Sequence, residues 1–285
     1  MQSRIYKASE PKKGYTPIVS PKNSELKYVE FGRLCLPQKG DEYRGTTADR
    51  EAVLAIFGGK CSAEIECPSQ TISYAKIGNR TDVFSGKPTM IYLPPKAEFK
   101  LTAETEMLEV GVCLAPSEAD CPPVLVRPED VVEKSAGTSN WSRKVYTCVG
   151  DNVKAKRLLV GETVNPPGNW SSAPPHKHDV KSAFETPLEE VYFFKIMPTQ
   201  GFGLQRIYSG PEDREPFDEV YAVENNDAVV IPRGYHPVVA GPGYQLYYLW
   251  MLAGEERRYG AWTDDPRHSW LRDRESQISE VSHHL

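Results

Sequence analysis

Short apolar runs recur along this chain, and proline and glycine separate them. The runs occupy residues 53–57, 89–93 and 107–114 in the first half, and 191–196, 204–208, 228–231 and 244–252 in the second. Valine, isoleucine, tyrosine and phenylalanine dominate these runs, as is typical of β-strands. Helical periodicity is scarce: 264–278 is compatible with a helix, and so is 48–56, where a strand competes. The pattern therefore predicts an all-β chain.

The apolar runs also repeat at a constant offset of nearly half the chain. At this offset residues 53–57 fall on 191–195, 91–94 on 229–232, and 112–115 on 250–253. Because three runs match at one offset, we predict two copies of a single β-unit. We place the first in residues 1–135 and the second in 136–285, with the boundary within 125–140.

Composition and charge limit the kinds of binding partner that this chain can have. The net charge of −5 disfavours a nucleic-acid partner, which would need a basic face, but allows a small anionic substrate. The N-terminus lacks the apolar core of a signal peptide, and no apolar run is long enough for a transmembrane helix. We therefore expect a cytoplasmic protein with no membrane partner, whose six cysteines are free thiols.

Histidine distribution places the candidate chemistry in the second half. No histidine precedes His176, which forms an H-x-H pair with His178, and His236 follows a Pro-Arg-Gly-Tyr turn. Side chains two apart on a strand share a face, so both imidazoles of the pair can reach one point. Glu190 opens a strongly apolar strand, where a carboxylate is costly unless its charge is held. The offset of the repeat aligns Glu190 with Ala52, so we expect the site in the second copy alone.

Three imidazoles and one carboxylate form a ligand set for a divalent metal ion. Zn, Mn, Fe, Ni and Co all accept nitrogen and oxygen ligands, so the set does not select among them. An octahedral ion with these four ligands keeps two positions open, where two neighbouring oxygens of a substrate can bind. An H-x-H pair alone would be a weak signal, but its combination with Glu190 and His236 is far more specific.

The order of these ligands resembles the two metal motifs of the cupin superfamily. The resemblance implies two jelly-roll, or double-stranded β-helix, barrels in a bicupin, the first degenerate and without metal. Two departures stand out. The gap between His178 and Glu190 is longer than the common cupin spacing, and Tyr235 alone separates Gly234 from His236, where two intervening positions are usual.

Longer runs are similar to a narrower family, the 5-deoxy-glucuronate isomerases of inositol catabolism. They read GETVNPPGNWSS at 161–172, PPHKHD at 174–179, LEEVY at 188–192, PRGYHP at 232–237, MLAG at 251–254 and NWSRKV at 140–145. The resemblance implies an aldose–ketose isomerase that converts 5-deoxy-D-glucuronate to 5-dehydro-2-deoxy-D-gluconate. In the related 5-keto-4-deoxyuronate isomerases the acid directly precedes Val-Tyr, which favours Glu190 over Glu189 as the ligand.

Other roles stay open in the sequence. Tyr192 shares the face of Glu190 and is a candidate for hydrogen bonding or proton transfer, alongside a hydroxide on the metal. On residues 204–208, either Gln205 or the face of Arg206 points inward; Arg206 would suit the substrate carboxylate. Lys177 alternates away from the histidines, so we expect it outside.

Three other functions use the same features. An isomerase for another deoxyuronate, such as 5-keto-4-deoxyuronate, would differ only in pocket shape. An Fe(II) cupin dioxygenase would use the same ligands. A sugar-sensing barrel would normally carry a DNA-binding helical domain, for which the sequence shows no pattern. By analogy with other cupin-type barrels, which often pair through their sheets, we expect a homo-oligomer.

Overall fold

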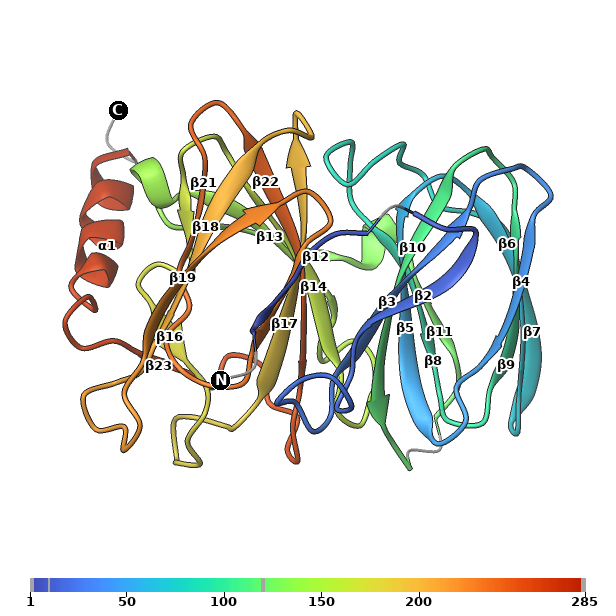
Figure 1. Ribbon diagram of the computed structural model, residues 1–285, viewed down its shortest axis with the longest axis horizontal. Coiled ribbons are helices and arrows are strands. Elements are labelled where there is room, and N and C mark those ends of the chain that lie inside the picture. Colours follow the sequence, from blue (N-terminus) through green and yellow to red (C-terminus); the bar gives the residue numbers. More distant parts are fainter. Residues whose placement is uncertain (1–2, 10, 119–120, 283–285) are drawn as a thin grey trace.

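Two β-barrels lie side by side in the computed structural model (Figure 1), which describes residues 3–9, 11–118 and 121–282. All strand pairings between named strands are antiparallel. The expected all-β bicupin architecture is confirmed.

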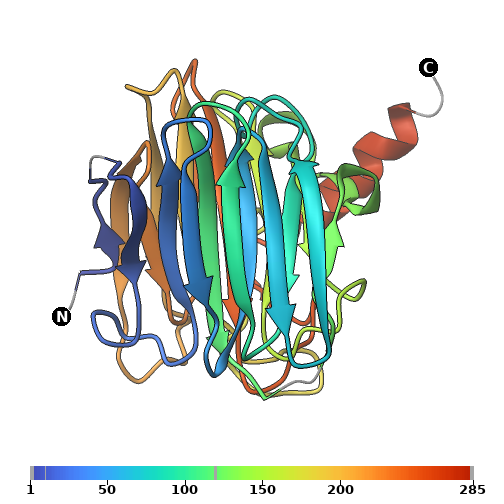
Figure 2. The same cartoon turned by 90° about the vertical axis from the view of Figure 1, so that its right-hand side faces the viewer.

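The first barrel consists of a six-stranded sheet facing a four-stranded sheet. The six-stranded sheet runs in the order β11 (Val124–Val126), β8 (Thr89–Leu93), β5 (Arg50–Gly58), β10 (Leu108–Pro116), β3 (Glu30–Leu36) and β2 (Gly14–Val19). The four-stranded sheet runs β4 (Glu42–Thr46), β9 (Glu98–Ala103), β6 (Cys61–Cys67) and β7 (Gln70–Ile77). Figure 2 shows the strands of this barrel next to one another, with the C-terminal helix projecting at the edge of the molecule.

The second barrel repeats this arrangement with one more sheet. Its seven-stranded sheet runs β1 (Ile5–Tyr6), β20 (Ala228–Ile231), β17 (Glu189–Met197), β22 (Gln245–Ala253), β14 (Leu159–Asn165), β13 (Arg143–Val149) and β12 (Val132–Ala136). A four-stranded sheet of β15 (Trp170–Ser171), β21 (Val238–Ala240), β18 (Phe202–Tyr208) and β19 (Asp218–Glu224) faces it. The pair β16 (His176–Lys177) and β23 (Thr263–Asp264) closes one end. The helices are η1 (Pro128–Asp130), η2 (Ser139–Trp141) and α1 (Leu271–Ser282).

Strand register confirms the internal repeat. In the first barrel Leu54 pairs with Ile91 on one side and with Val112 on the other. Tyr192 of the second barrel pairs with Val229 and Trp250. Tyr192, Val229 and Trp250 follow Leu54, Ile91 and Val112, respectively, at the same offset that relates the apolar runs. The two barrels therefore share pairing as well as an apolar pattern.

The central strands of both barrels are apolar on both faces because both faces are buried. Leu54 and Ile56 of β5 point into the first barrel, whereas Val53 and Phe57 belong to a core between the barrels. Residues 192 and 194 of β17 fill the second barrel, and Phe193 packs between the barrels against Phe57 with ring centroids 5.4 Å apart. Burial on both faces explains why these strands read as continuous runs and not as alternating ones.

The chain passes between the barrels in two places. β1 pairs Ile5 with Val229, so the first strand joins the sheet of the second barrel. β12 belongs to the same sheet and spans the expected boundary between 135 and 136. We propose that the barrels divide between Val126 and Val132 and that the N-terminal residues through Tyr6 belong with the second barrel.

The two helix expectations have different outcomes. Residues 50–58 form β5, so the strand alternative holds there and the helix at 48–56 is wrong. At the C-terminal end the helix starts at Leu271, later than expected, because Thr263–Asp264 pair with β16. Within the described residues no helix is long and apolar enough to cross a membrane. None of the six cysteines, all of which lie within the described residues, forms a disulfide bond.

Candidate metal centre

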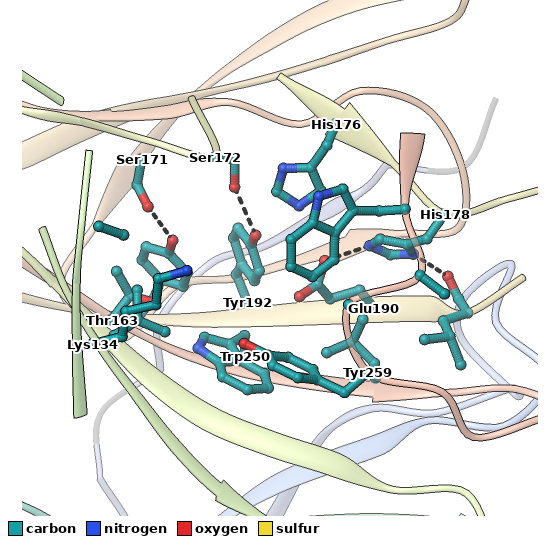
Figure 3. Close-up of a pocket in the computed structure, with 18 of the residues that line it drawn as sticks. Lys134, Thr163, Ser171, Ser172, His176, His178, Glu190, Tyr192, Trp250 and Tyr259 are labelled. Atoms are coloured by element: carbon teal, nitrogen blue, oxygen red, sulfur yellow. Dashed lines mark hydrogen bonds and ion pairs between the residues drawn. The ribbon is translucent and has the colours of Figure 1, made fainter. Parts of the chain in front are cut away.

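His176, His178 and Glu190, three of the four predicted ligands, line a pocket in the second barrel (Figure 3). The fourth, His236, packs against His176 with ring centroids 4.8 Å apart. β16 supplies His176, the loop that follows it supplies His178, β17 supplies Glu190, and the turn before β21 supplies His236. The ligand atoms of the three histidines all lie within 4.8 Å of one another. His178, Glu190 and His236 are buried, while His176 lies at intermediate exposure.

Backbone carbonyls orient two of the three imidazoles. Nδ1 of His178 lies 2.7 Å from the carbonyl oxygen of Leu188, and Nδ1 of His236 lies 2.9 Å from that of Gly234. When each Nδ1–H donates to its carbonyl, each Nε2 presents a lone pair to the pocket. This is the usual way in which outer contacts set the tautomer of a metal-binding histidine.

Glu190 completes the cluster from the adjacent strand. Its Oε2 lies 3.2 Å from Nε2 of His178 and 3.3 Å from Nε2 of His236. Nε2 of His236 is fully buried and makes no hydrogen bond, because its contact with Glu190 lacks hydrogen-bond geometry. A buried nitrogen without a partner is costly, and a metal ion would satisfy it. The residues present therefore fit a divalent cation.

Strand alternation separates Glu190 from Glu189, as the sequence predicted. Glu190 points into the second barrel, whereas Glu189 points to the first, where it accepts hydrogen bonds from the backbone N–H groups of Lys27, Tyr28 and Val29. With its carboxylate held by these three donors, Glu189 is not available to the histidines.

The pKa shifts favour the neutral form of two histidines of the site, His176 and His236. Burial lowers the pKa of His176 well below its ordinary value, and the nearby positive charges of His236, His178 and Arg143 lower it further. Burial also lowers the pKa of His236. Burial acts in the same direction on His178, but the hydrogen bond and charge of Glu190 outweigh it and raise the pKa of His178. Neutral imidazoles are the form that binds metals.

A pair of tyrosines lines the pocket beside the histidines. The hydroxyl of Tyr192 hydrogen-bonds Ser172 Oγ at 3.2 Å, and the hydroxyl of Tyr248 hydrogen-bonds Ser171 Oγ (Figure 3). The two tyrosine rings lie 4.3 Å apart, and that of Tyr192 is 6.0 Å from the ring of His236. Burial raises the pKa of Tyr192 well above its ordinary value, so this hydroxyl stays protonated at neutral pH. Tyr192 thus lines the same pocket as Glu190, and its role in proton transfer or hydrogen bonding stays a prediction.

The prediction that Arg206 clamps the substrate is wrong. Arg206 lies on the outer face of β18, where Nε and Nη2 bind the carboxylate of Asp218 at 2.8 and 2.6 Å, and it does not line the pocket. The inward residue is Gln205, which is fully buried and donates to the carbonyl oxygens of His236 and Pro237 at 2.9 and 3.1 Å. Gln205 thereby supports the backbone that carries a candidate ligand.

Lys177 is buried, which corrects the expectation that it lies outside. It points away from the histidines, but its ammonium lies 2.6 Å from Asp179 Oδ1 and 3.3 Å from Glu185 Oε1. Asp179 uses its other oxygen to accept the N–H of Gly234 at 2.7 Å. Gly234 adopts φ +94°, in the region that favours glycine, and an added Cβ would lie 2.6 Å from the carbonyl oxygen of Tyr208. Asp179 therefore ties the H-x-H segment to the turn that carries His236.

Sequence reasoning missed two groups of residues in the pocket. The first group is aromatic: Trp262 lies 5.1 Å from His176, and Tyr259 stacks on Trp250 at 5.7 Å (Figure 3). The second is cationic and consists of Lys134, Arg143, Arg258 and Arg272. No local pattern marks these side chains, since the pocket collects them from β12, β13, the segment after β22 and α1.

Comparisons with known protein sequences find similarity over most of the chain. The model of the KduI/IolB family matches residues 5–271. A 5-deoxy-glucuronate isomerase from Geobacillus kaustophilus (strain HTA426) is 38% identical over 265 residues, 92% of either chain. The 5-deoxy-glucuronate isomerase of Bacillus subtilis (strain 168) is 36% identical over 259 residues, 90% of this chain and 92% of that protein.

Solved structures extend the comparison to the fold. The crystal structure of an IolB-like protein from Salmonella typhimurium LT2 superposes with a TM-score of 0.87 at 34% identity and covers 95% of this chain and 100% of that one. Oxalate decarboxylase of Bacillus subtilis superposes with a TM-score of 0.64 at 10% identity over 93% of this chain and 80% of that one. At that identity the second similarity concerns the fold alone.

Proposed function

The chain belongs to the KduI/IolB family, and from this premise we propose that it isomerises 5-deoxy-D-glucuronate to 5-dehydro-2-deoxy-D-gluconate. Relatives named 5-deoxy-glucuronate isomerase share more than a third of their residues with it over about nine tenths of either chain. The observation that carries the proposal is the convergence of His176, His178, His236 and Glu190 in one cluster of the second barrel, which borders a pocket lined by three of them.

The donor set suits a divalent ion of the Zn, Mn, Fe, Ni or Co group. His176, His178 and His236 would hold it through nitrogen, and Glu190 through oxygen. When bound, the ion supplies a Lewis acid for the negative charge that develops on the substrate oxygens.

The reaction moves one hydrogen between neighbouring carbons. The aldose loses the proton on C2 and becomes an enediolate; C1 then gains a proton, and the hydroxyl proton of O2 is transferred to O1. Atoms balance, and no redox partner is consumed. The pocket must therefore provide a group that takes a proton from C2 and returns it to C1.

Glu190 is our candidate for that group. It is the sole carboxylate among the described residues that line the pocket, and its Oε1 makes no hydrogen bond within this part of the chain. One oxygen can thus face the histidines while the other exchanges the proton. Tyr192, with a hydroxyl that stays protonated, donates a hydrogen bond to a substrate oxygen and otherwise pairs with Ser172.

The aromatic side chains around the pocket limit access of water. Trp250 is buried and Tyr259 stacks on it, while Trp262 lies against His176. Exclusion of water strengthens the electrostatic contacts made to a charged intermediate.

A proton NMR time course in D2O tests the proposal. Purified protein loaded with Mn²⁺ or Zn²⁺ is incubated with 5-deoxy-D-glucuronate, with and without chelator. We expect metal-dependent formation of the 5-keto product with deuterium incorporated at the receiving carbon. Absence of turnover by metal-loaded protein would refute the proposal.

Parallel incubations separate the alternative activities. Turnover of 5-keto-4-deoxyuronate in place of 5-deoxy-D-glucuronate would assign another deoxyuronate. Oxygen uptake by the Fe(II)-loaded protein would assign a cupin dioxygenase.

We also propose that the protein works in the cytoplasm, since no disulfide joins its six cysteines and four of them are buried. Self-association into a homo-oligomer remains a prediction, which light scattering of the purified chain tests.

A further inference from the structure

The pocket has more positive than negative side chains. Among the described residues, Lys134, Arg143, Arg258 and Arg272 line it, and Glu190 alone opposes them. Arg272 is already paired, with Nε and Nη2 at 2.9 and 3.1 Å from the oxygens of Asp264. Arg258 is exposed and donates to the carbonyl oxygen of Ala183 at 3.3 Å. The third arginine of the pocket, Arg143, has different contacts from those of Arg272 and Arg258.

Arg143 lacks a carboxylate partner within the described chain. Its Nη1 donates to the carbonyl oxygens of Trp141 and Ala173 at 3.1 and 3.2 Å. Nε is fully buried and has no hydrogen-bond partner, and Nη2 makes none with the described residues. The Nε–Nη2 edge, which can bind a carboxylate with two parallel hydrogen bonds, therefore has no hydrogen-bond partner within the described chain.

The position of Arg143 fits the far end of the proposed substrate. It starts β13, and the carbonyl of Ala173 that holds it directly follows Ser172, the partner of Tyr192. Arg143 lines the same pocket as His176 and Glu190, and its contact with the carbonyl of Ala173 places it on the side of the tyrosines.

An unpaired guanidinium in such surroundings is costly, and a bound anion removes that cost. We propose that Arg143 binds the carboxylate of the substrate, while C1 and C2 lie at Glu190 and the three histidines. Lys134, whose side chain extends into the pocket in Figure 3, adds positive charge at the pocket wall. This inference rests on the proposed function, and it makes Arg143 the residue that selects a sugar acid over a neutral sugar.

Two substrates that share the reacting end test the inference. 5-Deoxy-D-glucuronate carries the carboxylate, and 5-deoxy-D-glucose has the same C1 and C2 without it. We expect Arg143→Gln to lower kcat/KM for the acid by about 100-fold, as for loss of a buried charge-assisted pair. Activity on the neutral sugar should stay within about twofold of the wild-type value. Arg143→Lys keeps the positive charge but loses the paired N–H donors of the guanidinium, so its kcat/KM for the acid should lie between those of the wild type and Arg143→Gln.

Arg206→Gln is the matched control, because it removes an arginine from the outer face of the same barrel. It should leave both substrates unaffected. Equal losses on the acid and the neutral sugar in Arg143→Gln would show a structural role and overturn the inference. An unchanged preference for the acid would overturn it as well.

Calorimetric binding of 5-deoxy-D-glucuronate to the metal-loaded protein separates this inference from the proposed function. If the wild-type protein binds the acid but does not turn it over, and Arg143→Gln weakens binding about 100-fold, the role of Arg143 stands and the isomerase proposal fails. If the wild-type protein turns the acid over but Arg143→Gln binds it equally well, the isomerase proposal stands and the role of Arg143 fails.

Discussion

Glu51 and Glu189 occupy the same position in the two barrels, and each carboxylate holds the backbone of the opposite barrel. Glu51 accepts the N–H groups of residues 156–158, each at 2.7 Å. Glu189 accepts those of residues 27–29 at 2.5 to 2.7 Å. The contacts are reciprocal, so each barrel holds the segment that leads into a strand of the other. The first barrel thereby anchors the strand that carries Glu190.

Replacing Glu189 should therefore weaken the whole molecule. Glu189→Ala leaves three backbone donors without their charged acceptor, and we expect a loss of about 2–4 kcal/mol in the free energy of unfolding. Urea denaturation followed by fluorescence measures the change. Glu51→Ala should cost a similar amount, and an unaltered unfolding midpoint in both variants would contradict the reciprocal role.

The ligand assignment predicts loss of metal without loss of fold. His176→Ala and His236→Ala should each lower bound metal, measured by elemental analysis after dialysis, and reduce turnover by at least about 100-fold. Circular dichroism should stay as in the wild type. His268→Ala serves as the control, since His268 lies outside the pocket. Full metal content in either ligand variant would show that the assignment is wrong.

Asp179 should act on metal binding although it is not a ligand. Its Oδ2 accepts the N–H of Gly234, two residues before His236. Asp179→Ala frees that turn, so we expect metal affinity to fall by about 10-fold in a chelator competition. Asp218→Ala, which removes the partner of Arg206 on the outer face, should leave affinity unchanged. Equal affinities in the two variants would rule out the positioning role.

Tyr192 should affect the chemical step more than metal binding. Tyr192→Phe removes a hydroxyl that lies in the pocket and hydrogen-bonds Ser172, so we expect kcat to fall by about 10- to 100-fold. Metal content should remain that of the wild type. Steady-state kinetics with 5-deoxy-D-glucuronate checks this, and a kcat within twofold of wild type would exclude the hydrogen bond from catalysis.

Gly161 sets how closely β14 approaches the pocket wall. A Cβ at this position would lie 2.1 Å from a ring carbon of Trp250 and 2.3 Å from the carbonyl oxygen of Tyr146. Gly161→Ala should displace Trp250 and destabilise the fold by about 1–3 kcal/mol. Thermal unfolding measures this, with Gly168→Ala for comparison at a position where nothing lies within 4 Å but φ is positive. An unshifted melting temperature for Gly161→Ala would contradict the packing argument.

The sequence alone determined the parts of this protein that depend on local order. Apolar runs that repeat at one constant offset predicted two copies of one β-unit, and the structure pairs Leu54 and Tyr192 in corresponding registers. Alternation along one strand required Glu189 and Glu190 to face opposite sides, and the resemblance to the 5-keto-4-deoxyuronate isomerases favoured Glu190 as the ligand.

Tertiary structure decided what lies on each side of a strand. On β18 the apolar Leu204 is exposed and the polar Gln205 is buried, so alternation alone left both faces open. Arg206 was a candidate because its guanidinium suits a carboxylate, but it lies on the outer face. Lys177 is buried because Glu185, brought back by a loop, offsets its charge. Arg143 enters the pocket only after β13 pairs with β14 and the chain at Ala173 closes over it. These contacts join segments far apart in the chain, and their energies depend on a packing that no local pattern encodes.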